Sequence, residues 1–117
     1  TTSEQLHDLE ERLVALRGIF DIDAKVQLIE KEEEESQAAD FWDDPKKAEI
    51  FLKKISKKKT WTTAFQSTKT NLDDLVVLLE FHKEGEATEK EVVEQYEKTL
   101  KSFIIFLLPS LISLRLT

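Results

Sequence analysis

Three acidic residues in the first third of the chain have the spacing of calcium ligands. Asp21, Asp23 and Glu32 fall at the first, third and twelfth positions of a helix–loop–helix calcium site. The sixth position of such a loop needs glycine, but Val26 stands there, and Lys25 occupies a ligand position. We therefore expect no calcium site in this segment.

The remaining reactive side chains form no catalytic set. The chain has no cysteine, and its two histidines, His7 and His82, stand far apart with no second histidine at ligand spacing. The two glycines, Gly18 and Gly85, are too few for a glycine-rich phosphate loop. Carboxylates are plentiful, but acid–base catalysis needs one of them desolvated in a cleft, which nothing in the sequence indicates. We expect no enzyme, no cofactor and no metal site.

The charge pattern is more informative, because acids and lysines are separated into two blocks. Residues 30–44 hold eight acids and one lysine, and residues 46–59 hold seven lysines and one acid. One interpretation is that the blocks lie side by side on two helices and neutralise each other. The other is a basic face offered to phosphates or to an acidic partner, with Lys53, Lys54, Lys57 and Lys58 as its candidate contacts. This block contains no arginine and one aromatic residue, Phe51, so we expect backbone contact with structured RNA at most, and no DNA binding.

Two aromatic residues, Phe41 and Trp42, lie near the end of the acidic block, in a predicted connection between helices. One interpretation is that they close the end of a helical bundle beneath this connection. The other is that they form a docking contact for a partner, since exposed aromatic residues often dominate binding energy.

These side chains must be positioned by helices. Two glycines and two prolines in 117 residues are too few for the turns of an all-β fold. Apolar residues recur every three or four positions in four segments, as in amphipathic helices. The first segment carries Leu6, Leu9, Leu13 and Leu16 and ends or bends at Gly18. The second begins at Asp21 or Asp23 and buries Ile22, Val26 and Ile29.

The third predicted helix begins at Asp44–Pro45, a cap residue followed by a residue that needs no N–H partner. It meets no breaker before Gly85, and it carries two seams of positions seven apart. The first seam is Ala48, Ile55, Thr62, Lys69 and Val76; the second is Phe51, Lys58, Phe65, Leu72 and Leu79. The fourth helix follows the capping signature of Thr88 and Glu91, and Pro109 ends or kinks it. One face of it carries Val92, Tyr96, Leu100, Phe103 and Leu107.

We therefore predict an all-α fold. It is an antiparallel helical bundle with a long coiled-coil-like hairpin, and two shorter N-terminal helices pack beside the hairpin. Residues 1–108 form this bundle domain, and residues 109–117 are an apolar tail. The net charge of −7, the absence of cysteine and the lack of an apolar leader at the start fit a cytoplasmic protein.

The stretch from residue 103 to 116 has a single charge, Arg115. It is too short to span a membrane, and Pro109 interrupts it. Burial in the chain's own core is the first expectation. The alternatives are self-association through this apolar tail, a strand separated from a neighbouring domain, and a membrane surface.

Two motifs of this sequence resemble bacterial peptide chain release factor 2. They are the run from Leu16 to Lys25, LRGIFDIDAK, and the run from Asp40 to Ala48, DFWDDPKKA. Their order and separation also match, and the resemblance covers residues 5–100, the amino-terminal helical domain of that family. After Lys101 the chain departs from the family, which continues into a glycine-rich, β-rich domain.

The resemblance implies a role in translation termination. A complete factor of this family reads UGA or UAA stop codons with a Ser-Pro-Phe motif and triggers peptidyl-tRNA hydrolysis with a Gly-Gly-Gln motif. Neither motif occurs here. The family's helical domain reaches the ribosomal stalk base, near protein L11 and its rRNA. The resemblance thus implies a non-catalytic segment that orients the factor on the ribosome. The alternative is a coiled-coil adaptor that binds another helix through the long seam.

Overall fold

The computed structural model describes the backbone of residues 3–116 and the side chains of residues 3–107. Its elements are α1 (Ser3–Ile19), α2 (Ile22–Glu35), the short 3-10 helix η1 (Phe41–Asp43), α3 (Pro45–Lys83) and α4 (Glu89–Leu116). Within the described backbone there is no strand, so the prediction of an all-α fold is confirmed.

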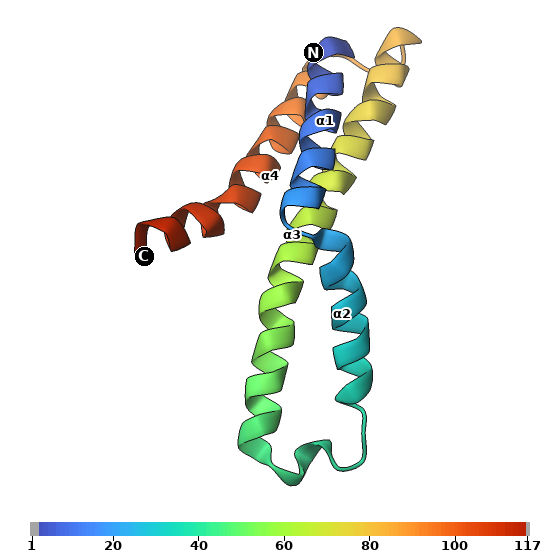
Figure 1. Ribbon diagram of the computed structural model, residues 1–117. Helices are drawn as coiled ribbons and strands as arrows, with labels where there is room; N and C mark the ends of the chain where they lie inside the picture. Colours follow the sequence, from blue (N-terminus) through green and yellow to red (C-terminus); the bar gives the residue numbers. More distant parts are fainter. Residues whose placement is uncertain (1–2, 117) are drawn as a thin grey trace.

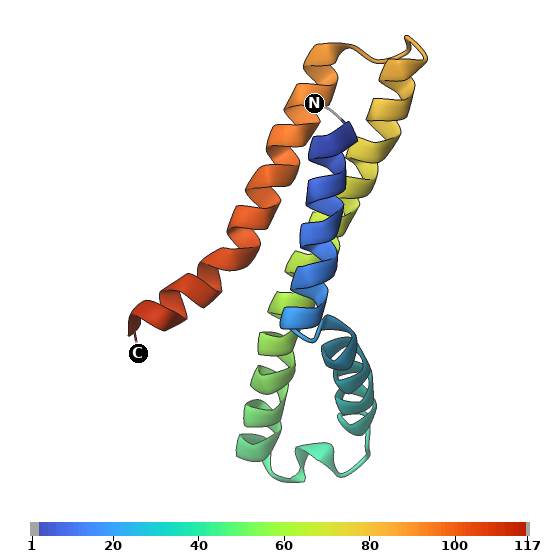
Figure 2. The ribbon, with the colours of Figure 1, turned by 45° about the horizontal axis from the view of Figure 1, so that its top comes forward.

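Helix α3, 39 residues long, is the axis along which the other helices lie (Figure 1). Helix α4 returns antiparallel to it after the turn at Gly85, and α1 and α2 follow one another along α3 in the opposite direction to it (Figures 1 and 2). The molecule is therefore a rod, with extents of 61 × 34 × 21 Å. One half contains α1, α3 and α4, and the other half contains only α2 and α3. The two shorter helices were expected to pack beside the hairpin, and they do so one after the other along α3.

Local chemistry fixes three of the helix boundaries where the sequence predicted them. The carboxylate of Asp44 accepts a hydrogen bond of 3.2 Å from the backbone N–H of Lys47, and Pro45 is the first residue of α3. At the other end of α3, Gly85 has a φ of 81°, a backbone conformation that favours glycine because it has no Cβ. The hydroxyl of Thr88 then accepts a hydrogen bond of 3.1 Å from the N–H of Glu91 at the start of α4.

The corner between α1 and α2 differs from the prediction. Gly18 lies inside α1, which continues to Ile19, and the chain turns from α1 into α2 at Asp21, whose φ is 48°. An aspartate tolerates this left-handed conformation better than most residues do. On α2, Ile22 and Ile29 are buried as predicted, but Val26 is 41% exposed. The expectation for Val26 was wrong because α2 packs mainly against α3, and one main neighbour covers only a narrow stripe.

The core lies mainly in the three-helix half of the rod. Its buried members come from α1, α3 and α4: Leu9, Leu72, Leu75, Leu79, Val92 and Phe103. A second cluster of Ile22, Phe65 and Phe106 lies near the α1–α2 corner. There the ring of Phe20 stacks on Trp61 with 5.0 Å between the ring centres. The two clusters bury the faces of α1 and α4 that the sequence marked as apolar.

The heptad prediction for α3 was correct in one seam and shifted in the other. Phe65, Leu72 and Leu79 of the second seam are buried. In the first seam Ala48 and Ile55 are buried as predicted, but further along α3 Thr68 and Leu75 are buried in place of Lys69 and Val76. The shift has a physical cause. A straight helix has 3.6 residues per turn, so a seven-residue repeat drifts around it. The helices that cover α3 also change along its length: α2 lies against its first half, and α1 and α4 lie against its second half (Figures 1 and 2).

The C-terminal part of α4 continues through Pro109, so the helix does not end there as one prediction had it. In Figures 1 and 2 this last part, drawn in red, bends away from the other helices. Phe103 and Phe106 are buried, while Ile104 and Ile105 are 59% and 62% exposed. The side chains of residues 108–117, where most of the predicted tail falls, lie outside the described residues. The division at residue 108 stays a prediction. Among the described residues, no helix has both the length and the apolar character needed to cross a membrane.

Candidate functional site

Two lysines of the basic block pair with two glutamates of the acidic block across the two-helix half of the rod. The Lys58 ammonium lies 2.5 Å from Glu32 Oε1, and these two side chains are only 24% and 10% exposed. Lys59 pairs with Glu33 in the same way, at a more exposed position. The predicted neutralisation between helices is therefore confirmed for these two lysines.

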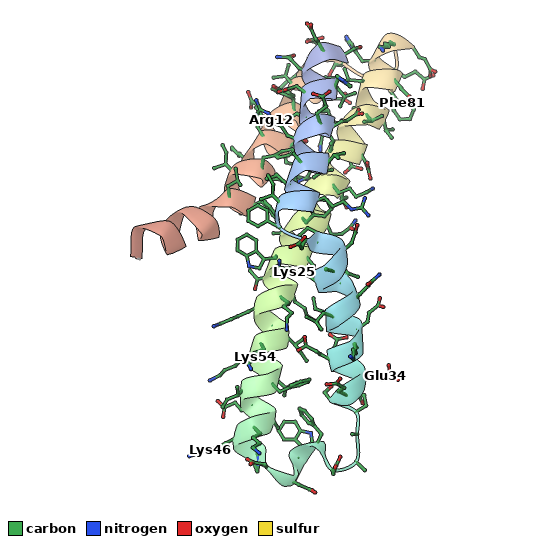
Figure 3. The ribbon with its side chains drawn as sticks, viewed as in Figure 1. Arg12, Lys25, Glu34, Lys46, Lys54 and Phe81 are labelled. Atoms are coloured by element: carbon green, nitrogen blue, oxygen red, sulfur yellow. The ribbon has the colours of Figure 1, made fainter. Side chains whose placement is uncertain are left out.

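Most of the lysine block has no partner on α2. Lys53 lies 3.0 Å from Glu49 on its own helix. Lys46, Lys47, Lys54 and Lys57 are exposed and make no ion pair with any residue that the structure describes. In Figure 3, Lys46 and Lys54 lie on the side of α3 that faces away from α2. We call the five residues Lys46, Lys47, Lys53, Lys54 and Lys57 the lysine face.

The four lysines singled out from the sequence are thus divided by the structure. Lys53, Lys54 and Lys57 belong to the lysine face, whereas the ammonium of Lys58 is held by Glu32. Sequence reasoning could not separate Lys58 from the others, because the alignment of α2 against α3 decides which lysine meets a glutamate.

The two candidate aromatic residues also have different environments. Phe41 is half-buried, and its ring meets that of Phe51 edge-on with 5.6 Å between their centres. This contact closes the end of the helix pair, as one interpretation of Phe41 predicted. Trp42 is 61% exposed and touches Phe41 edge-on, so the interpretation of a docking contact stays a prediction for Trp42.

An ion pair that the sequence reasoning missed holds the α1–α2 corner. The guanidinium of Arg17 donates to the Asp23 carboxylate from Nε at 3.0 Å and from a terminal nitrogen at 2.8 Å. This hydrogen bonding and the negative charge of Asp23 raise the pKa of Arg17 above its ordinary value. The Lys25 ammonium donates to the carbonyl of Phe20 across the same corner. The Arg-Gly-x-x-Asp-x-Asp spacing was the available signal.

These contacts also use the carboxylates of the calcium-like spacing. Asp23 is occupied by Arg17 and Glu32 by Lys58. Among the described residues, no three histidine or acidic side chains are grouped so that they could hold a metal ion. A hollow of about 610 Å³ lies beside the corner, lined by Val14 and Asp21 among others, and it is open to solvent.

Comparison with known proteins finds relatives of this chain. No family model matches it. Peptide chain release factor 2 of Pasteurella multocida is 33% identical over 96 residues, which is 80% of this chain and 26% of that protein. Release factor 2 of Shewanella baltica is 30% identical over 97 residues, 83% of this chain and 25% of that protein. The chain is homologous to a segment of peptide chain release factor 2. The resemblance stated from its two motifs is thereby confirmed.

The chain spans about a quarter of the length of the release factor 2 proteins that it matches. The two motifs that carry the likeness to release factor 2 both form corners of the rod. The first supplies Arg17, Asp21 and Asp23 at the α1–α2 corner, and the second supplies Phe41 and the Asp44 cap at the start of α3. Both motifs therefore lie where the chain passes from one helix to the next.

Proposed function

We propose that this chain is the helical segment of a release factor 2-like protein that acts in translation termination at UGA and UAA stop codons. In this role it orients the factor at the ribosomal stalk base, against protein L11 and its rRNA, in the cytoplasm. The observation that carries the proposal is the homology to release factor 2 over about four fifths of the chain. We further propose that the segment is not catalytic alone, because it lacks the Gly-Gly-Gln and Ser-Pro-Phe motifs of the family.

The shape of the rod supports a positioning role. Bidentate pairing of Arg17 with Asp23 holds one corner, and the contact of Phe41 with Phe51 holds the other. Because α3 runs along the whole rod (Figure 1), the segment, 61 Å long, sets the distance between its two ends. Such a segment can hold the remainder of a factor in one orientation when its own surface is bound.

Electron cryo-microscopy of the complete factor on ribosomes stalled at a UGA codon tests the placement. We expect density for the rod against L11 and the neighbouring rRNA. A complex in which the codon is read while the rod stands clear of the stalk base contradicts the orienting role. In a parallel assay, the isolated chain is added to termination complexes carrying labelled peptidyl-tRNA, with the complete factor as the positive control. Peptide release by the isolated chain contradicts the non-catalytic assignment.

Self-association is a second proposal, and the exposed side chains of Ile104 and Ile105 favour it. Sedimentation velocity of the chain with and without residues 103–117 tests it. A dimer that is lost on deletion supports association through the apolar tail. A dimer that survives deletion supports the coiled-coil adaptor instead, and a monomer at all concentrations contradicts both.

A further inference from the structure

The lysine face is the largest concentration of unneutralised charge of one sign that the sequence places on a single helix segment. Residues 46–59 contain seven lysines, of which α2 neutralises Lys58 and Lys59 and Glu49 pairs with Lys53. The other four ammonium groups have no carboxylate partner among the described residues. Their charges add to the positive end of the helix dipole at the start of α3.

Helical geometry places these lysines in a compact strip. At 1.5 Å per residue, the eleven steps from Lys46 to Lys57 cover about 17 Å along the axis, and the five residues fall within about 120° around it. Lys53 and Lys57 are like charges four residues apart, an arrangement that destabilises a helix in isolation. An anion bound along the strip removes this repulsion. The acids of α2 do not, because Glu34 lies on the outer side of α2, away from the strip (Figure 3).

We propose that the lysine face binds the phosphate backbone of double-helical RNA. The inference rests on the proposed function in one respect, since a ribosome-bound segment meets structured RNA. It goes further by naming the lysine face as the surface that makes the contact and backbone phosphates as the groups that it binds. The lysines contact phosphate oxygens as point charges and read no sequence, because lysine ammonium groups lack the fork of arginine that pairs with base edges in two places.

The composition of the strip favours a nucleic-acid backbone over an acidic protein. Protein interfaces have an apolar or aromatic centre and are depleted in lysine. Here the exposed apolar residue that falls among the lysines by helical spacing is Ile50. A row of lysines along one helix face is instead the usual footprint of phosphate binding.

The aromatic residues near the strip argue for a duplex over a single strand. Single-stranded RNA is bound by stacking of its bases on exposed aromatic rings. Trp61 is stacked on Phe20, and Phe51 packs against Phe41, so these rings are not free for bases. Trp42 is exposed, but its neighbours Asp43 and Asp44 repel phosphates.

Fluorescence anisotropy of the full chain with a labelled, fully paired RNA hairpin tests the proposal. We expect binding that weakens on the order of 100-fold between about 50 and 200 mM KCl, as four or five neutralised phosphates require. The variant K46Q/K47Q/K54Q/K57Q is expected to bind at least about tenfold more weakly. The slope of the logarithm of its binding constant against the logarithm of the salt concentration is expected to be smaller by about four. The variant K83Q/K90Q/K98Q/K101Q has the same net charge, with its substitutions outside the strip, and is expected to bind like the unchanged chain.

Besides absence of binding to the hairpin, three results overturn the proposal. They are equal losses in the two glutamine variants, equal or tighter binding of an unpaired RNA of the same length, and equal or tighter binding of polyglutamate. The last result assigns the strip to an acidic protein. If circular dichroism shows that the first variant does not fold, K46R/K47R/K54R/K57R replaces it. This variant keeps the charge and must keep both the affinity and the salt slope.

The readouts separate this inference from the proposed function. Absence of binding to the hairpin overturns the lysine face as an RNA contact, whatever the rod does on the ribosome. A complete factor whose rod stands away from the stalk base overturns the proposed function, whatever the hairpin assay shows.

Discussion

Replacement of Glu32 by glutamine is expected to destabilise the chain about four times more than the same replacement of Glu33, its neighbour on α2. Both residues pair with a lysine of α3, so the chemical change is the same. Their surroundings differ: the Glu32 and Lys58 side chains are 10% and 24% exposed, whereas those of Glu33 and Lys59 are 43% and 53% exposed. The comparison therefore isolates the effect of burial on an ion pair.

The expected magnitudes follow from this exposure. Removing one partner of a fully buried pair costs roughly 3–5 kcal/mol, because the other charge is left without compensation. Lys58 keeps a quarter of its side chain in water and can still bond to the amide, so about 2 kcal/mol is expected for Glu32→Gln. The exposed pair is worth about 0.5 kcal/mol. For a chain of this size these losses lower Tm by about 8 °C and about 2 °C.

Thermal and urea unfolding, followed by circular dichroism at neutral pH, measures both variants. A double-mutant cycle with Lys58→Met and Lys59→Met separates the pair energy from the loss of packing. Because salt screens exposed charges more than buried ones, the smaller effect is expected to vanish at high ionic strength while most of the larger one remains. Equal losses in the two variants, or a larger loss for Glu33→Gln, refute the reasoning from burial.

Three further substitutions probe the core, the turn and the helix cap. Leu75→Ala removes a fully buried side chain and is expected to lower the free energy of urea unfolding by about 3 kcal/mol. Val77→Ala, on the exposed side of α3, is expected to lower it by less than about 0.5 kcal/mol. Similar losses in the two variants would contradict the assignment of Leu75 to the buried face of α3. Gly85→Ala is expected to cost about 1 kcal/mol because φ is 81° there, and an unchanged Tm would show that this turn does not need glycine. Asp44→Ala is expected to cost about 1 kcal/mol through loss of the cap, and Asp44→Ser to restore most of it.

The parts of the fold that the sequence predicted are those decided within a few residues. Asp44 and Pro45 start α3 through a hydrogen bond to a residue three positions away, and Gly85 turns the chain through its own φ. The prediction for Phe65, Leu72 and Leu79 was correct because all three lie in the part of α3 that α1 and α4 cover. The other seam was correct at Ala48 and Ile55 and wrong at Lys69, because the buried stripe shifts where one covering helix is replaced by another.

The same limit of sequence-based prediction applies to the lysine face. The sequence showed that a lysine block and an acidic block were present, but Lys58 and Lys54 look equivalent in it. Only the alignment of α2 along α3 places Glu32 opposite Lys58 and leaves Lys54 in solvent. The Arg17–Asp23 pair was missed for a similar reason, since it depends on the left-handed backbone at Asp21 that brings α1 and α2 together.

The unequal thickness of the rod has a dynamic consequence. Amide protons in the three-helix half are shielded by a core that opens only when most of the chain unfolds, whereas α2 can separate from α3 by breaking few apolar contacts. Hydrogen–deuterium exchange is therefore expected to be faster along α2 and the first half of α3 than along α1, α4 and the second half of α3. At the end that carries the lysines, the distance between α2 and α3 can thus change to fit an irregular surface, while the three-helix half keeps its form.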